Sequence, residues 1–127
     1  MNFARIFIAC FALMLGMTSA HALDSAPYTP EALAAAQKAG KPVALHFHAN
    51  WCPTCRAQEK VFNEFRPDAA LAITVLVADY DKERELKRKL GVRSQSTVIV
   101  YRGARETARL AGDTDPAILR AALQSAL

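Results

Sequence analysis

The chain has 127 residues, of which 52% are hydrophobic and 22% charged, and its formal net charge at pH 7 is +4. This charge is mild, and the sequence has no patch of interleaved basic and aromatic residues, so we expect no nucleic-acid partner. The length suits one domain with a single core and leaves no room for a second, and we expect a monomer.

The first 22 residues have the pattern of a secretory signal peptide. Arg5 precedes an apolar run over residues 6–17, which is followed by small residues and by Ala20-His21-Ala22. The run is shorter than the roughly 20 apolar residues that span a bilayer. The pattern predicts cleavage after Ala22, with an uncleaved anchor as the alternative. We therefore expect export, and a bacterial periplasm fits the signal.

Cleavage removes Cys10 and leaves Cys52 and Cys55 as a single pair of cysteines. An oxidising compartment allows such a pair to form a disulfide. We expect the remaining chain to consist of a short N-terminal tail over residues 23–28 and one domain over residues 29–127.

The domain begins with an alanine-rich helix that starts at Thr29 and ends at Gly40. A hydroxyl cap, a proline in the first turn and a glycine after the last turn are typical of helix ends. The mostly apolar run over residues 43–49 indicates a central strand covered on both faces. Residues 53–65 follow as a helix, whose apolar stripe contains Val61, Phe62 and Phe65.

The second half alternates in the same way. We expect a buried strand over residues 71–78, a solvent-facing helix over residues 79–91 capped by Asp79, and an antiparallel hairpin with strands over residues 97–101 and 106–110. Asp115 begins the last helix. The order αβαβαββα predicts a three-layer α/β/α sandwich with a mixed central sheet.

The most informative motif is the pentapeptide Trp51-Cys52-Pro53-Thr54-Cys55. Two cysteines three residues apart lie close enough on one helical turn to form a disulfide. If Cys52 is the N-cap and Pro53 the first helical residue, the helix dipole and free amides favour the Cys52 thiolate. We predict that Cys52 is reachable and attacks a partner, and that Cys55, one turn in, resolves the mixed disulfide.

Residues 47–55 resemble the active-site strand and turn of the thioredoxin family. Residues 91–97 are similar to the family segment before its third strand, and Gly112 stands where the family has a glycine before its last helix. The likeness covers nearly all of residues 29–127. Together with the export signal, Lys41-Pro42-Val43 most resembles exported thioredoxin-like proteins and the C-terminal domain of the disulfide reductase DsbD.

This resemblance implies a thioredoxin-like fold and an exported thiol-disulfide oxidoreductase that needs no bound cofactor. It implies cysteine-containing exported proteins as partners and a membrane disulfide reductase as electron donor. It favours a reductase or electron relay, with an oxidase as the second choice. Cys52 would be the nucleophile and Cys55 the resolving thiol. The residues expected to bind the partner protein are Trp51, Pro53, Thr54, Gln95, Ser96 and Thr97.

Two residues depart from the family pattern. His46 stands where the family has a buried carboxylate, so we predict that its neutral imidazole takes the proton of Cys55; the alternative is a histidine satisfied inside the sheet. Ser96 stands where the family has a cis-proline. Because a non-proline cis bond costs about 2.5 to 4 kcal/mol, we predict a trans bond before it. Its hydroxyl either bonds the Cys52 thiolate or belongs to an ordinary polar loop.

The histidines open an alternative function. His46, His48, Cys52 and Cys55 offer two nitrogens and two sulfurs, a set that a periplasmic zinc or copper carrier could use. The spacing is unlike that of a zinc finger, and our main prediction includes no metal. Arg56 after the second cysteine excludes a c-type heme site. A purely structural disulfide is the third class, although so small a loop stabilises a fold little.

Overall fold

The computed structural model describes residues 22–127, so the predicted signal peptide over residues 1–22, with Cys10, lies outside them except for Ala22. The elements along the described residues are β1 (Asp24–Pro27), α1 (Pro30–Lys38), β2 (Pro42–His48), α2 (Pro53–Phe65), β3 (Thr74–Asp79), α3 (Arg84–Leu90), β4 (Thr97–Arg102), β5 (Arg105–Ala111) and α4 (Pro116–Gln124). None of these helices has the length and apolar character needed to cross a bilayer.

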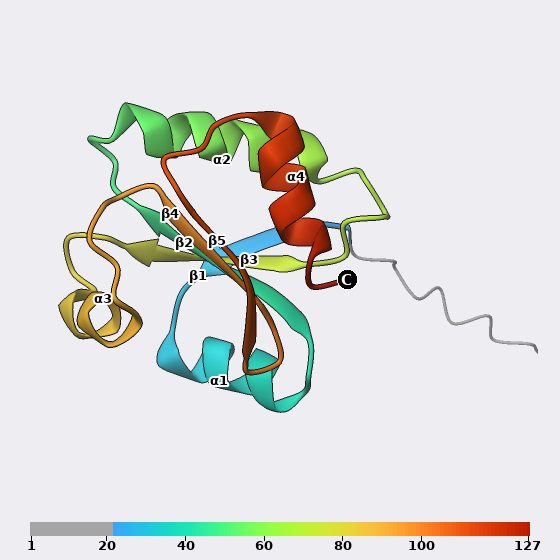
Figure 1. Ribbon diagram of the computed structural model, residues 1–127, viewed down its shortest axis with the longest axis horizontal. Helices are drawn as coiled ribbons and strands as arrows, with labels where there is room; N and C mark the ends of the chain where they lie inside the picture. The colour runs from blue at the N-terminus through green and yellow to red at the C-terminus, as the bar shows by residue number, and fades with distance from the viewer. Residues whose placement is uncertain (1–21) are drawn as a thin grey trace, which may run out of the picture.

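The five strands form one mixed sheet in the order β1-β3-β2-β4-β5. Strands β1, β3 and β2 run parallel, whereas β4 is antiparallel to both β2 and β5. Helices α2 and α4 cover one face of this sheet, and α1 and α3 cover the other (Figure 1). The predicted three-layer α/β/α sandwich is therefore confirmed.

The central strand β2 contributes to both layers of the core because successive side chains point to opposite faces. Val43, Leu45 and Phe47 are buried against the α1 and α3 side, while Ala44 belongs to the core under α2 and α4. His46 shares that second face and packs edge-on against Phe62 of α2, with ring centroids 5.3 Å apart. A strand buried on both faces explains its nearly continuous apolar run.

The predicted caps of the first and last helices are present. The Thr29 hydroxyl accepts a hydrogen bond from the Ala32 amide at 3.0 Å, and Pro30 occupies the first turn of α1. The Asp115 carboxylate accepts from the amides of Ala117 and Ile118 at the start of α4. In each case a side-chain oxygen satisfies amides that the helix itself leaves free.

The prediction that residues 23–28 form a tail is wrong, because the structure places a strand there. In β1, Asp24 pairs in register with Thr74 and Pro27 with Val77 of β3. Leu23 is only 4% exposed and packs in the core. The segment is short and contains a proline, so its sequence shows no strand pattern. It forms a strand because it pairs with the edge of β3. The folded unit thus includes Leu23 and β1, which precede residue 29.

The elements on either side of Asp79 are shorter than expected. The strand predicted from Leu71 begins at Thr74, and the helix predicted from Asp79 begins at Arg84. The Asp79 side chain accepts from the amides of Asp81 and Lys82, so it closes a turn instead of capping a helix. Aspartate favours such local turns in competition with helix formation.

Candidate active site

The cysteine motif lies where the C-terminal end of β2 leads into α2. The Cys52 amide donates to the Ala49 carbonyl at 3.0 Å, which forms the turn between the two elements. Cys52 has extended backbone angles and is the N-cap of α2, and Pro53 stands in the first turn. The Cys52 sulfur accepts the Cys55 amide at 3.1 Å. Both predicted positions are confirmed, and the attacking sulfur takes the place of a capping oxygen.

The surroundings separate the two thiols in acidity. Burial acts to raise the pKa of Cys52, but hydrogen bonds from the Cys55 thiol, the Ser96 hydroxyl and two backbone amides outweigh it and hold that pKa below the usual value. For Cys55, burial and the bond to Cys52 raise the pKa. Cys52 is therefore the more acidic thiol of the pair and ionises before Cys55.

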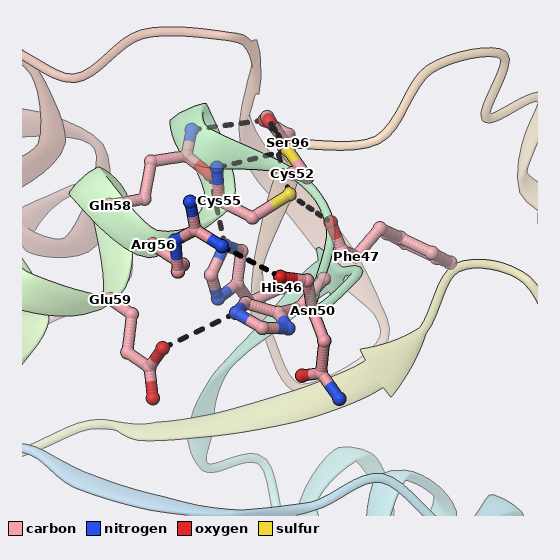
Figure 2. A network of polar contacts seen from close by, with 10 residues as sticks. His46, Phe47, Asn50, Cys52, Cys55, Arg56, Gln58, Glu59 and Ser96 are labelled. Carbon is pink, nitrogen blue, oxygen red and sulfur yellow. Dashed lines mark hydrogen bonds and ion pairs between the residues drawn. The ribbon is translucent and has the colours of Figure 1, made fainter.

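Both cysteines are covered. Cys52 is 1% exposed and Cys55 is fully buried, so the prediction that Cys52 is reachable is wrong for this structure. The cover is the loop before β4, whose Ser96 Oγ lies 3.2 Å from each sulfur (Figure 2). This loop is remote from the motif in sequence, so the motif alone gives no sign of it. A partner disulfide must therefore displace neighbouring side chains to reach Cys52.

Ser96 adopts a left-handed backbone conformation with φ of 65°, and residues 22–127 contain no cis peptide bond. The predicted trans bond is thus confirmed. A left-handed residue with a side chain costs roughly 1–2 kcal/mol. Three hydrogen bonds offset this cost: the Ser96 amide donates to the Phe47 carbonyl at 2.9 Å, and its carbonyl accepts from the Gly112 amide and from Gln58 Nε2, each at 3.0 Å.

His46 is bonded to Gln58 rather than to a cysteine. Its Nε2 lies 2.9 Å from Gln58 Oε1, and an amide oxygen only accepts, so Nε2 carries the hydrogen. Burial lowers the pKa of His46 to about 4, although the bond to Gln58 acts to raise it. The low pKa keeps the ring neutral. The hydrogen bonds described for Cys55 Sγ go to Ser96 Oγ and, at 3.8 Å, to the Phe47 carbonyl. Proton transfer from Cys55 to His46 therefore has no direct hydrogen bond to follow among the described residues.

Gln58, a fully buried residue of α2, belongs to the site but lies outside the cysteine motif that predicted it. Its Nε2 donates to the carbonyls of Ser96 and Asp113, at 3.0 and 2.8 Å, and its Oε1 accepts from His46. Gln58 thus joins the central strand to the loops before β4 and before α4. Its spacing could have indicated this role. Gln58 lies three residues after Cys55 and three before Val61, which puts its side-chain amide in the buried stripe of the helix.

The residues predicted to bind the partner lie at different depths. Trp51 is 57% exposed, and its indole donates to Asp81 Oδ2 at 2.8 Å. Pro53 is also exposed, and Thr54 and Gln95 are half-buried. Ser96 and Thr97 are buried, and the Thr97 hydroxyl donates to the Ser94 carbonyl within its own loop. Trp51 and Pro53 form a surface beside the cysteines, while Thr97 faces inward, and binding by this set stays a prediction.

The metal-carrier alternative gains no support from the geometry. Within residues 22–127, no group of three or more histidine, cysteine or acidic side chains is arranged to hold a metal ion. His46 is bonded to Gln58, and His48 Nε2 lies 3.3 Å from the Glu59 carboxylate. Binding a metal through these rings would require both to leave their partners.

The chain is similar to known proteins across nearly all of the described residues. The family model for thioredoxin matches residues 28–125. A thioredoxin of Alicyclobacillus acidocaldarius is 35% identical over 57% of this chain and 69% of its own length, and one of Rickettsia bellii is 30% identical over 54% and 66%. The thiol:disulfide interchange protein DsbD of Ralstonia nicotianae is 34% identical over 76% of this chain but only 18% of its own length.

Solved structures agree with this likeness. The crystal structure of Trxlp from Edwardsiella tarda is 32% identical, covers 79% of this chain and 98% of its own, and superposes with a TM-score of 0.74. The sandwich fold, the Cys52 and Cys55 pair at the start of α2 and the family match agree with one another. This chain belongs to the thioredoxin family and is a thiol-disulfide oxidoreductase whose dithiol is Cys52-Pro53-Thr54-Cys55.

Proposed function

We propose that this oxidoreductase is exported to a bacterial periplasm and acts there as a reductase or electron relay for cysteine-containing proteins. The observation that carries the proposal is the place of Cys52 at the start of α2, where hydrogen bonds outweigh burial and lower its pKa, while burial raises the pKa of Cys55. A dithiol in this state passes two electrons to a disulfide and becomes a disulfide itself.

The reaction proceeds in two exchanges. The Cys52 thiolate attacks one sulfur of the partner disulfide, so that a mixed disulfide forms and the other partner sulfur leaves as a thiolate. Cys55 then attacks the Cys52 sulfur, the mixed disulfide breaks, and the reduced partner departs. A membrane disulfide reductase is the proposed donor that restores the dithiol.

The proposed direction of electron flow is supported by the kind of groups that stabilise the Cys52 thiolate, which are hydrogen-bond donors and, among the described residues, include no cation. A strongly oxidising dithiol owes its potential to a stabilised reduced form. Here the residue after Pro53 is the uncharged Thr54, and the Arg56 guanidinium donates to the Asn50 carbonyl at 2.9 Å. The similarity to part of DsbD further supports a reductase or relay.

The reduction potential tests this direction. We expect a value nearer to about −270 mV, as in thioredoxin, than to about −120 mV, as in DsbA. The measurement equilibrates residues 23–127 with thiol buffers of defined potential and counts free thiols by alkylation. The double variant Cys52→Ser, Cys55→Ser is the control and should show no transition. A midpoint close to that of DsbA would contradict the proposed direction.

Export and partners need a separate experiment. Alkaline phosphatase without its own signal should become active in bacterial cells when fused after the full chain, and stay inactive when residues 1–22 are removed. The exported Cys55→Ser variant should retain partners as mixed disulfides at Cys52, which mass spectrometry identifies. Equal phosphatase activity of both fusions, or a trap that retains no exported protein, would count against this part of the proposal.

A further inference from the structure

The second exchange poses a problem of proton transfer. Cys55 holds its proton in the resting dithiol and must lose it before its sulfur can attack Cys52. Cys55 is fully buried, so bulk water does not meet the thiol in the structure. The group that receives this proton must therefore belong to the elements packed against the thiol.

Most of the neighbouring polar groups have other partners. On β2, the neutral His46 uses its Nε2 hydrogen on Gln58, and His48 faces the Glu59 carboxylate of α2. On the same strand, the Phe47 carbonyl lies 3.8 Å from Cys55 Sγ and has no proton to pass on. None of these groups both accepts a hydrogen bond from Cys55 Sγ and carries a proton that it can pass on.

The remaining neighbours are also occupied. Tyr80, which packs against the cysteines from the end of β3, donates its hydroxyl to the Arg93 carbonyl at 3.2 Å. The Arg56 guanidinium of α2 bonds the Asn50 carbonyl. Among the described residues, Ser96 is thus the side chain with a transferable proton that hydrogen-bonds Cys55 Sγ, apart from Cys52 itself.

The position of Ser96 Oγ suits transfer between two sulfurs. It lies 3.2 Å from Cys55 Sγ and 3.2 Å from Cys52 Sγ (Figure 2). A hydroxyl accepts one hydrogen bond while it donates another. In the mixed disulfide it can therefore accept a hydrogen bond from the Cys55 thiol while its own hydrogen points to the Cys52 sulfur and the partner sulfur bonded to it. The backbone bonds of Ser96 to Phe47, Gly112 and Gln58 hold the hydroxyl in this place.

We propose that the Ser96 hydroxyl is a catalytic proton relay for the resolving exchange. As the Cys55 sulfur forms its bond to Cys52, the bond between Cys52 and the partner breaks, and its electron pair goes to the partner sulfur. The Cys55 proton moves to Ser96 Oγ, and the hydroxyl hydrogen of Ser96 moves to the departing partner sulfur. Ser96 ends as a hydroxyl, ready for the next cycle. This inference rests on disulfide exchange through Cys52 and Cys55.

The leaving group provides the test, because a relay matters most when the departing sulfur needs a proton. The reduced protein is mixed with glutathione disulfide or with Ellman's reagent, and acid-quenched samples are analysed by mass spectrometry for the mixed disulfide. Glutathione leaves as an ordinary alkyl thiol, whereas the aromatic thiolate of Ellman's reagent leaves without a proton. For Ser96→Ala, we expect resolution of the glutathione adduct to slow on the order of 10²-fold, and resolution of the aromatic adduct to change far less.

Two further variants separate the hydroxyl from the backbone. Ser96→Gly lacks the hydroxyl but suits a φ of 65°, so it should behave like Ser96→Ala. Ser94→Ala removes a hydroxyl from the same loop and should resolve both adducts at the wild-type rate. Equal slowing with both leaving groups, no slowing, or different behaviour of the alanine and glycine variants would overturn the relay. If the wild-type protein itself resolved neither adduct, the exchange function would fail instead.

Discussion

Burial decides the charge state of His46 beside the active site, and its bond to Gln58 fixes which ring nitrogen carries the hydrogen. A histidine at this position suggests a proton acceptor for Cys55, and its type and place in β2 were readable from the sequence. Its partner was not, because the choice between Cys55 and Gln58 depends on how the faces of β2 and α2 meet. Side-chain geometry of this kind follows from packing rather than from local pattern.

The neutral state of His46 predicts a loss of stability in acid. Its pKa in the folded protein, about 4, lies below the value of 6.5 for a free histidine, so between these values the unfolded chain binds more protons. The stabilising contribution is complete above about pH 6.5 and is lost as the pH falls toward 4. A shift of this size corresponds to about 3 kcal/mol. Urea unfolding at several pH values measures it.

The comparison needs two variants. His46→Leu should lack this part of the pH dependence, whereas His48→Leu should keep it, because the two histidines lie on the same face of β2 but only His46 is fully buried. Identical pH profiles for the wild-type protein and His46→Leu would show that burial of the His46 ring does not cause the loss of stability in acid.

At the level of elements, capping residues and apolar runs predicted most of the helices and strands. The start of α2 at Cys52 and Pro53 follows from local chemistry, and so does the start of α4 at Asp115. Strand β1 could not be predicted in this way, since its hydrogen bonds come from β3, about 50 residues further along the chain. Contacts between distant segments likewise place the Ser96 loop over the cysteines.

Gln58 ties α2 to two loops, so its removal should loosen that side of the molecule. Gln58→Met keeps the length of the side chain but leaves the His46 Nε2 hydrogen and the Asp113 carbonyl without their partner. We expect a loss of about 2–4 kcal/mol in the free energy of unfolding, measured by urea denaturation. Glu64→Met, on the exposed face of the same helix, is the control and should change stability by less than about 0.5 kcal/mol. Equal effects would contradict the role assigned to Gln58.

Removal of the Leu23 side chain should also destabilise the fold. Because Leu23 is buried in the core before the first strand, Leu23→Ala should destabilise residues 22–127 by about 2 kcal/mol or more. Leu127→Ala, at a position 45% exposed, is the matched control and should have little effect. Thermal or urea unfolding decides between them. An unchanged midpoint for Leu23→Ala would mean that this segment contributes no stability.

Across the whole molecule, the sheet order brings together three segments that meet at the cysteines: the end of β2, the start of α2 and the loop before β4. Gln58 links the loop before α4 to them. The layered fold was predictable from the order of elements, since crossover connections and one terminal hairpin allow few arrangements. The burial of Cys52 was not, because it depends on the conformation of one loop residue.

The proposed direction of electron flow predicts which redox state is more stable. A disulfide between Cys52 and Cys55 closes a loop of four residues, which lowers the entropy of the unfolded chain by the equivalent of about 2 kcal/mol. The Cys52 thiolate of the reduced form is stabilised by hydrogen bonds and by no cation among the described residues, so we expect the oxidised protein to unfold at a higher temperature. Calorimetry with and without reductant tests this, with the Cys52→Ser, Cys55→Ser variant as control. A more stable reduced form would indicate an oxidase.

The backbone of Ser96 also limits how this chain could evolve toward its relatives. Its amide hydrogen is used by the Phe47 carbonyl, and its φ is 65°, whereas proline has no amide hydrogen and fixes φ near −65°. A single codon change to proline would thus break a buried contact and demand a new path for the loop. A proline at position 96 therefore requires further changes in the residues that hold this loop.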